Sequence, residues 1–217
     1  MYVVGIDTTT RNFCIALVND RRVLGRMIVT GKGFHSEECI VYLQDLLKEH
    51  ALSNQDIGGY AISIGPGSLT GVRVGLAFLK GIGFAEGKPV IPVETLLAIG
   101  YEFRGSEKLI CPVLETRRNR VFTALYQFTD SGQRTIVEQS CSEIRVLLEK
   151  LPGKEILFIG SGARIYRDVI VQQCGKGAHF SAIELTHPDP ALVAFIGLER
   201  MIKGTVPELE AVEPIYL

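Results

Sequence analysis

The sequence has little net charge, no long apolar run and no low-complexity segment. Its 23 Lys and Arg residues are balanced by 24 Asp and Glu residues, which gives a net charge of -1. Stand-alone binders of nucleic acid or acidic membrane normally carry a basic excess, so the balance argues against these classes. Because no stretch approaches roughly 18 uncharged apolar residues, we expect no membrane-spanning helix. The first residues lack the basic region of a signal peptide.

Paired cysteines and recognisable metal-ligand clusters are also missing. The five cysteines are odd in number, widely spread and never arranged as Cys-x-x-Cys. This pattern favours reduced thiols in a cytosolic protein over a disulfide or metal scaffold. His35 and Cys39 are four residues apart, but no further ligand stands at useful spacing, so a core position for Cys39 is favoured over a metal site. The four histidines form no recognisable catalytic set.

The apolar residues, 47% of the chain, suffice for a substantial core. Alternating and continuous apolar runs predict strands, and runs of period 3.6 predict helices. Each half then consists of a three-strand meander followed by alternating helices and strands, so one topology is used twice. The expected strands are 2–7, 13–18, 23–29, 60–64, 89–93, 109–114, 120–128, 134–139 and 156–159. The expected helices are 36–50, 70–85, 95–103, 142–151, 160–174 and 190–203.

Two loops in the first half are candidates for phosphate binding. The turn that starts at Asp7 is rich in hydroxyls, and such a turn can hold a phosphate with the acid placed for Mg²⁺. From spacing alone, an ordinary hairpin is favoured. The loop 65–71 opens a helix, where anions are favoured, but it is not a Walker A sequence. A sharp turn that needs glycine at positive φ explains this loop equally well.

The segment 70–85 has more apolar surface than one packed face requires. Apart from Thr70, Arg73 and Lys80, every residue in it is apolar or glycine. A helix on a sheet needs one apolar face, so the second face indicates either a protein interface or burial under helix 36–50. Glycines spaced four and eight residues apart form a strip that another helix could approach closely.

Two further clusters lie in the second half. Arg117, Arg118 and Arg120 form the expected tip of a hairpin, where a solvated surface is favoured over a contact with RNA or phosphate. The segment 160–163 (Gly-Ser-Gly-Ala), between a strand and a helix, could let an adenosine ring approach the backbone, although this short motif is a weak signal by itself.

Three segments taken together resemble the TsaB family, also called YeaZ. They are 5–10 (Gly-Ile-Asp-Thr-Thr-Thr), 35–37 (His-Ser-Glu) and 64–75, which contains the run Gly-Pro-Gly-Ser-x-Thr-Gly-x-Arg-x-Gly. That run is specific to this family and to its catalytic sibling TsaD. Weaker similarity at 92–96, 160–163 and 214–217 extends the resemblance over both halves.

The resemblance implies a two-lobed actin-like ATPase fold, of the actin/sugar kinase/Hsp70 type, with a mixed sheet flanked by helices in each lobe. We therefore expect an N-terminal lobe at 1–104, joined by the C-terminal helix at about 189–217, and a smaller C-terminal lobe at 105–188. In that fold the two loops described above are weak, vestigial nucleotide or phosphate sites. Their residues are Asp7, Thr8, Thr9, Thr10, Gly65, Gly67 and Ser68.

The resemblance also implies a non-catalytic, cytoplasmic partner that binds and activates a TsaD-like transferase. The transferase adds a threonylcarbamoyl group to the adenosine next to the anticodon of tRNAs. A TsaE-like ATPase joins the assembly, tRNA is reached only through the complex, and the isolated chain can form a homodimer. Family members pair through the helices at 36–50 and 70–85. The expected interface residues are Cys39, Leu43, Leu46, Gly71, Val72, Arg73, Gly75, Leu76, Leu79 and Gly83.

The sequence departs from active members of the superfamily at two places. The His-x-x-x-His metal motif of the sibling has no equivalent, because the nearest segment begins at His35 and has Cys39 at its fifth position. The second phosphate loop reads Glu115-Thr116-Arg117 where relatives more often have Asp-Ala-Arg. We therefore expect no resident metal and no cofactor held by this chain alone, with ATP or ADP only at the interface of the complex. The alternative is an independent ATP-dependent phosphotransferase, ATPase or protease.

Overall fold

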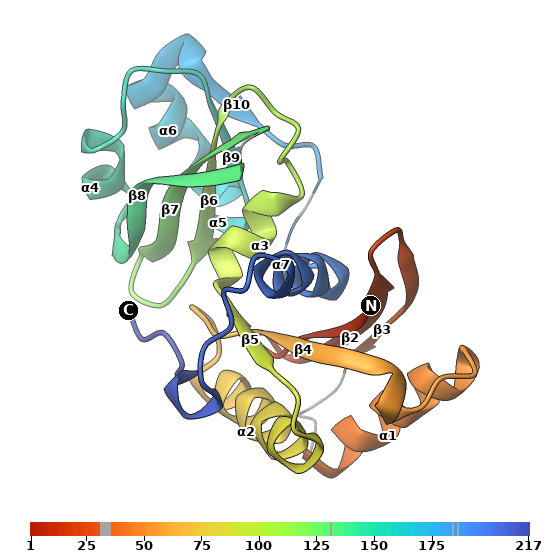
Figure 1. The fold of residues 1–217 in the computed structure, drawn as a ribbon. Coiled ribbons are helices and arrows are strands. Elements are labelled where there is room, and N and C mark those ends of the chain that lie inside the picture. Colours follow the sequence, from red (N-terminus) through yellow and green to blue (C-terminus); the bar gives the residue numbers. More distant parts are fainter. Residues whose placement is uncertain (31–35, 131, 184, 186) are drawn as a thin grey trace. The chain divides into compact units, whose positions relative to one another are not determined.

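The computed structural model describes residues 1–30, 36–130, 132–183, 185 and 187–217. The described residues form two compact units, Met1–Ala98 with His187–Tyr216 and Ile99–Thr186. Each unit is built around a five-stranded mixed sheet (Figure 1). Within the described residues, no helix combines the length and apolarity that a bilayer crossing demands.

The sheet of the first unit has the strand order β3-β2-β1-β4-β5. Strands β1 (Tyr2–Asp7), β2 (Asn12–Asn19) and β3 (Val23–Thr30) form the antiparallel meander, and β4 (Ile57–Ser63) and β5 (Val90–Val93) extend it in parallel. The apolar runs of β1 and β4 are buried because helices cover both faces of this sheet. Helices α1 (Ser36–Glu49) and α2 (Leu69–Glu86) lie on one face, and α7 (Pro190–Ile202) lies on the other (Figure 1).

The second unit repeats this topology. Strands β6 (Leu109–Glu115), β7 (Arg120–Thr129) and β8 (Gly132–Glu143) form its meander, and β9 (Ile156–Ile159) and β10 (Ala178–Phe180) add parallel strands. The order β8-β7-β6-β9-β10 matches that of the first sheet element by element. The expectation of one topology used twice is confirmed.

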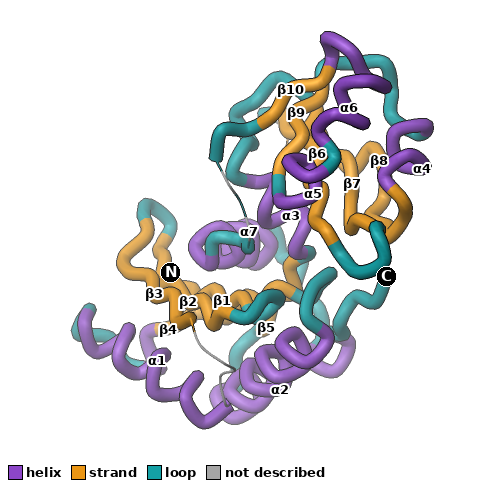
Figure 2. Tube along the Cα trace, turned by 180° about the vertical axis from the view of Figure 1, so that it is seen from behind, coloured by secondary structure: helices purple, strands orange, loops and turns teal. Residues whose placement is uncertain are grey.

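Short helices cover the second sheet (Figure 2). Helix α4 (Ile144–Glu149) follows the meander, and α5 (Ser161–Ile165) and α6 (Arg167–Cys174) lie between β9 and β10. The end of α3 (Thr95–Tyr101) packs on this sheet, where Tyr101 meets Phe128 edge-on at 5.9 Å.

Two local predictions were wrong, and one short strand was missed. The helix expected from residue 142 begins at Ile144, because β8 continues through Glu143. The helix expected over 160–174 is divided at Tyr166, whose φ of -101° and ψ of 20° end α5 before α6 begins. Strand β10 was not predicted, since its three residues are too few to show an alternating pattern.

Candidate functional site

The two candidate phosphate loops of the first unit meet at the carboxyl end of β1. The hydroxyl of Thr8 donates to the carbonyl of Gly71 at 2.8 Å. The backbone N–H of Ser68 donates to the carbonyl of Thr9 at 2.7 Å. Both bonds join the β1–β2 turn to the start of α2, so the structure brings the two predicted loops together. We call the turn 7–10 and the loop 65–71, joined in this way, the latch.

Asp7 is fully buried at the base of this latch. Its carboxylate accepts hydrogen bonds from the hydroxyl of Thr9 at 2.9 Å and from the backbone N–H of Thr9 at 3.3 Å. Burial raises the pKa of Asp7 to about 6, although Ser63, Thr9 and His187 act in the opposite direction. The carboxyl is therefore close to half-ionised in weakly acidic solution.

The hydroxyls that were expected to face a phosphate are engaged within the chain. Thr8 and Thr9 donate as described above, Thr10 accepts from the backbone N–H of Asn12 at 3.2 Å, and Ser68 caps α2 by accepting from Gly71 at 3.2 Å. A phosphate would have to compete with these hydrogen bonds. These hydrogen bonds hold the two loops to each other and to α2.

The glycines of the second loop have local structural reasons. Gly65 has a φ of 111°, a backbone conformation that residues other than glycine rarely adopt. A Cβ atom added at Gly67 would lie 2.6 Å from the carbonyl oxygen of Thr9. The sequence left two explanations for this loop, an anion site and a sharp turn that requires glycine. The positive φ of Gly65 and the close backbone approach at Gly67 agree with the sharp turn.

Two buried hydroxyls near the latch were not found by sequence reasoning. Ser63 ends β4 and acts on the Asp7 carboxyl as described above. Thr95 begins α3 directly after β5, and its hydroxyl has no hydrogen-bond partner among the described residues. Both lie just at or past the carboxyl ends of parallel strands, where ligands of open α/β sheets bind. Their position at the end of the predicted strand 60–64 and just after the predicted strand 89–93 was the signal that could have identified them.

The predicted interface residues are mostly interior residues. Arg73 is exposed, whereas the other nine are buried inside the first unit. Cβ atoms added at Gly71 and Gly75 would lie 2.0 and 2.4 Å from atoms of Thr8, and one added at Gly83 would lie 2.7 Å from Val90. Within this unit, the glycine strip lets α2 approach its own sheet and latch.

The outward surface of α2 shares only Arg73 with the predicted interface residues. We call it the α2 stripe; it comprises Leu69, Arg73, Ala77, Gly81 and Phe84. The exposed fractions of Leu69 and Phe84 are 51% and 79%. These spacings of three and four residues place all five on one side of the helix. Within the stripe, Arg73 donates to the hydroxyl of Tyr216 at 3.0 Å.

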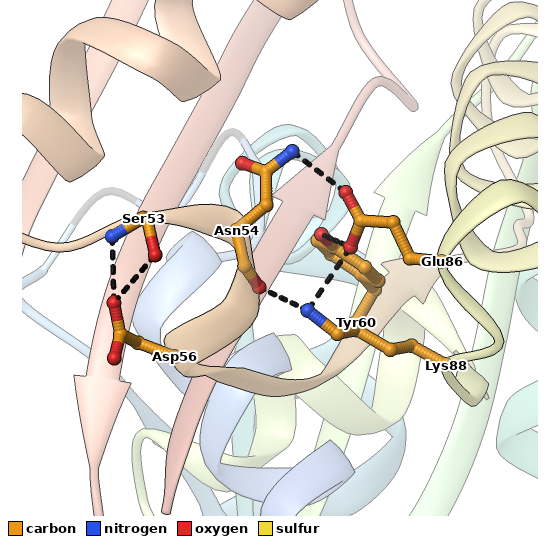
Figure 3. A network of polar contacts seen from close by, with 6 residues as sticks. All are labelled: Ser53, Asn54, Asp56, Tyr60, Glu86 and Lys88. Atoms are coloured by element: carbon orange, nitrogen blue, oxygen red, sulfur yellow. Dashed lines mark hydrogen bonds and ion pairs between the residues drawn. The ribbon is translucent and has the colours of Figure 1, made fainter.

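A polar network anchors the other end of α2 (Figure 3). The carboxylate of Glu86 accepts from the side chain of Asn54 at 2.6 Å and from the hydroxyl of Tyr60 at 2.7 Å. Lys88 forms an ion pair with Glu86 at 3.1 Å and donates to the carbonyl of Asn54. Burial and the neighbouring Glu86 raise the pKa of Tyr60. The network connects α2 to β4 and to the segment before it.

The carboxyl edge of the second sheet differs from that of the first. Glu115, at the position that corresponds to Asp7, is exposed, and its backbone N–H donates to the hydroxyl of Ser161 at 3.1 Å. A cavity of about 280 Å³ adjoins Ser161 and is also lined by Arg164, Arg167 and Phe180. Gly160 has φ of 92°, and a Cβ there would lie 2.7 Å from the carbonyl oxygen of Val113.

The potential metal ligands and the thiols lie at separate places in the structure. In the part of the chain that the structure describes, no three His, Cys, Asp or Glu residues are grouped as a metal site. His35 lies outside the described residues, and Cys39 is a core residue of the first unit. All five cysteines are free thiols: Cys14, Cys39, Cys111, Cys141 and Cys174.

Comparison with known proteins gives consistent matches over this architecture. A family model described as "TsaD: tRNA N6-adenosine threonylcarbamoyltransferase" matches residues 31–209. The "tRNA threonylcarbamoyladenosine biosynthesis protein TsaB" of Bacillus subtilis is 30% identical over 216 residues, which cover 96% of this chain and 93% of that protein.

Solved structures agree on the fold. A Pseudomonas aeruginosa protein described as similar to peptidase YEAZ superposes with a TM-score of 0.83 at 23% identity, covering 100% of this chain and 99% of that one. A ROK family protein from Streptococcus pneumoniae, solved with sucrose, superposes with a TM-score of 0.54 at 13% identity, covering 93% of this chain and all of that one. The predicted actin-like fold class is confirmed. Since the matches span nearly the whole chain, it belongs to the family of the tRNA threonylcarbamoyladenosine biosynthesis protein TsaB, also called YeaZ.

Proposed function

We propose that this chain is a non-catalytic subunit in the threonylcarbamoyl modification of the adenosine next to the anticodon of tRNAs. It binds a TsaD-like transferase and supports its activity. The names of its relatives support a role in this pathway. The accessory role is supported by the way in which the chain uses the two loops at the end of β1 and α2, the longest of its described helices.

The observation that carries the proposal is the combination of a closed latch and an open α2 stripe. The loops that hold phosphate in active relatives of this fold use their hydroxyls to position α2. The opposite side of the same helix exposes Leu69 and Phe84. Exposed apolar side chains gathered on one helix face are typical of protein interfaces. Ala77 and Gly81 lie between them and allow another backbone to approach closely.

The partner face in this proposal is therefore the α2 stripe. The buried residues of α2, such as Val72, Leu76 and Leu79, pack against the first unit and hold the stripe in place. A TsaD-like chain and a second copy of this chain compete for it, so a homodimer forms only in the absence of the partner. In this proposal a TsaE-like ATPase, ATP or ADP and tRNA engage the assembled complex.

Gly81→Leu tests the partner face without disturbing the chain itself. A Cβ added at Gly81 has no atom within 4 Å, so the isolated variant should fold normally. The matched control is Gly105→Leu in the second unit, where a Cβ also has open space. Each purified variant is mixed with the TsaD-like protein of the same organism, and the complex is sized by light scattering.

We expect a stoichiometric complex with the unchanged chain and with Gly105→Leu, and its loss with Gly81→Leu. Asp7→Asn should retain both the complex and the modification activity of the reconstituted system. If Gly81→Leu still binds, the α2 stripe is not the partner face. If Asp7→Asn abolishes modification while the complex remains intact, the chain contributes chemistry of its own and the alternative of an independent enzyme is favoured.

A further inference from the structure

The second unit carries a concentration of arginine that the proposed partner face does not use. Arg117 and Arg118 lie at the exposed tip of the β6–β7 hairpin. Among the described residues, neither guanidinium makes a hydrogen bond or ion pair that would neutralise it. Arg164 and Arg167 line the cavity beside α5. This grouping occurs in a chain whose overall net charge is -1.

The hairpin tip and the cavity are neighbours at the carboxyl edge of the second sheet. Glu115 immediately precedes the hairpin loop, and its N–H donates to Ser161, which lines the cavity. Arg117 is two residues beyond that contact, so at about 3.3 Å per residue its Cα lies at most roughly 7 Å from that of Glu115. The hairpin arginines and the cavity therefore adjoin the same contact between Glu115 and Ser161.

The cavity combines an aromatic ring with a guanidinium. Arg167 lies over the ring of Phe180 at 4.1 Å, and Phe180 in turn stacks on the buried Phe158 at 5.8 Å. Unpaired RNA bases are recognised by stacking on aromatic rings and arginine planes, while arginines outside the pocket contact phosphates. A concave site of about 280 Å³ suits a single nucleotide and not a flat membrane surface.

We propose that this edge of the second unit, formed by the β6–β7 hairpin and the cavity at Phe180, binds the tRNA. The hairpin arginines contact backbone phosphates and the cavity receives one unstacked nucleotide. The proposal rests on the proposed function for the identity of the RNA. It favours the RNA contact that the sequence left as the less favoured alternative to a solvated hairpin tip, and it departs from the expectation that tRNA is reached only through the complex.

The hairpin offers a variant that removes charge without harming the fold. Arg118 has φ of 62°, which glycine adopts more readily than arginine, so Arg118→Gly relieves the backbone while removing the guanidinium. It is combined with Arg117→Ala. The matched control is Arg21→Ala with Arg22→Ala, two exposed arginines at the β2–β3 turn of the first unit. Both pairs change the net charge equally, and circular dichroism checks that both fold.

Binding of the full-length chain to fluorescein-labelled, unmodified tRNA transcript is measured by fluorescence anisotropy from about 50 to 200 mM salt. We expect affinity to fall at least about tenfold in the hairpin pair and less than about twofold in the control pair. The slope of log affinity against log salt should fall by about 1.4, since each phosphate contact to a single strand contributes about 0.7. Phe180→Leu should weaken tRNA binding and leave binding to duplex DNA unchanged.

Three results would overturn the inference: no tRNA binding at low salt, equal losses in the two arginine pairs, or equal competition by phosphatidylserine vesicles. Complex formation with the TsaD-like partner is measured on the same variants. If the hairpin pair binds the partner and supports modification like the unchanged chain, the RNA surface is disproved while the proposed function stands.

Discussion

The hydroxyl of Thr8 donates a buried hydrogen bond to the carbonyl of Gly71 across 63 positions of the chain. This bond is possible because Gly71 and Gly75 have no side chains, so that the first two turns of α2 can rest directly on the β1–β2 turn. The latch therefore determines where α2 lies, and with it the position of the α2 stripe. We therefore expect substitutions at the latch to lower the free energy of unfolding.

Thr8→Val retains the shape of the side chain and removes the donor. We expect the free energy of unfolding to fall by about 1–2 kcal/mol, because the valine cannot replace a buried hydrogen bond. Thr8→Ser keeps the hydroxyl and should lose less. Urea denaturation of the three proteins measures the difference. Equal losses in both variants would show that the methyl group, and not the hydrogen bond, is what matters.

Two glycines of the same helix should respond in opposite directions to alanine. At Gly75 a Cβ would lie 2.4 Å from Oγ1 of Thr8, so we expect Gly75→Ala to cost about 1–3 kcal/mol. At Gly81 the space is open, and Gly81→Ala should stabilise the helix by up to about 1 kcal/mol. Thermal unfolding of both variants tests this. A stabilised Gly75→Ala would contradict the packing described for the latch.

The buried carboxyl of Asp7 should make stability depend on pH. Its pKa is raised from 3.8 to about 6 in the folded chain, so the folded state holds the proton more tightly than the unfolded state does. Stability contributed by the protonated form is full below about pH 4 and is lost as pH rises towards and past 6. The shift corresponds to about 3 kcal/mol.

Asp7→Asn isolates this effect, because asparagine keeps an acceptor for Thr9 and does not ionise. Urea midpoints measured at intervals from pH 4 to 8 should fall more steeply for the unchanged chain than for the variant. Above pH 6.5 the variant should be the more stable of the two. Parallel pH profiles would mean that Asp7 is not the group responsible.

Tyr60→Phe removes one hydrogen bond from the network at the end of α2. The hydroxyl of Tyr60 donates to Glu86 inside the first unit, so we expect a loss of about 1–2 kcal/mol in the free energy of unfolding. Tyr216→Phe is the matched control, since it removes a hydroxyl bonded to Arg73 at an exposed position and should change stability by less than about 0.5 kcal/mol. Comparable losses of unfolding free energy from Tyr60→Phe and Tyr216→Phe would show that the buried hydrogen bond contributes no more than the exposed one.

Sequence patterns sufficed for most of the fold. Period-2 and period-3.6 runs located both meanders and the long helices, because a buried face imposes its period on the residues that form it. Short elements such as β10 and the break at Tyr166 were missed, since three or four residues carry too few periods to be distinguished from loops.

Predicting the candidate site was harder. The sequence identified Asp7, Thr8 and Ser68 as a related set but not that their hydrogen bonds are satisfied by one another. It identified an apolar surplus in α2 but assigned the interface to residues that are buried. The number of apolar residues in α2 does not show which of its two apolar faces packs on the sheet, because the residues of both faces recur with the same helical period.

By itself, the sequence determined the repeated topology, the family and the position of the loops that meet at β1. These follow from local patterns and from a motif whose spacing is written in the chain. The tertiary structure decided what the glycines of α2 approach, which side chains remain exposed on its stripe, and that the start of the β6–β7 hairpin contacts Ser161 at the cavity. Those facts depend on contacts between residues distant in sequence, which no local pattern encodes.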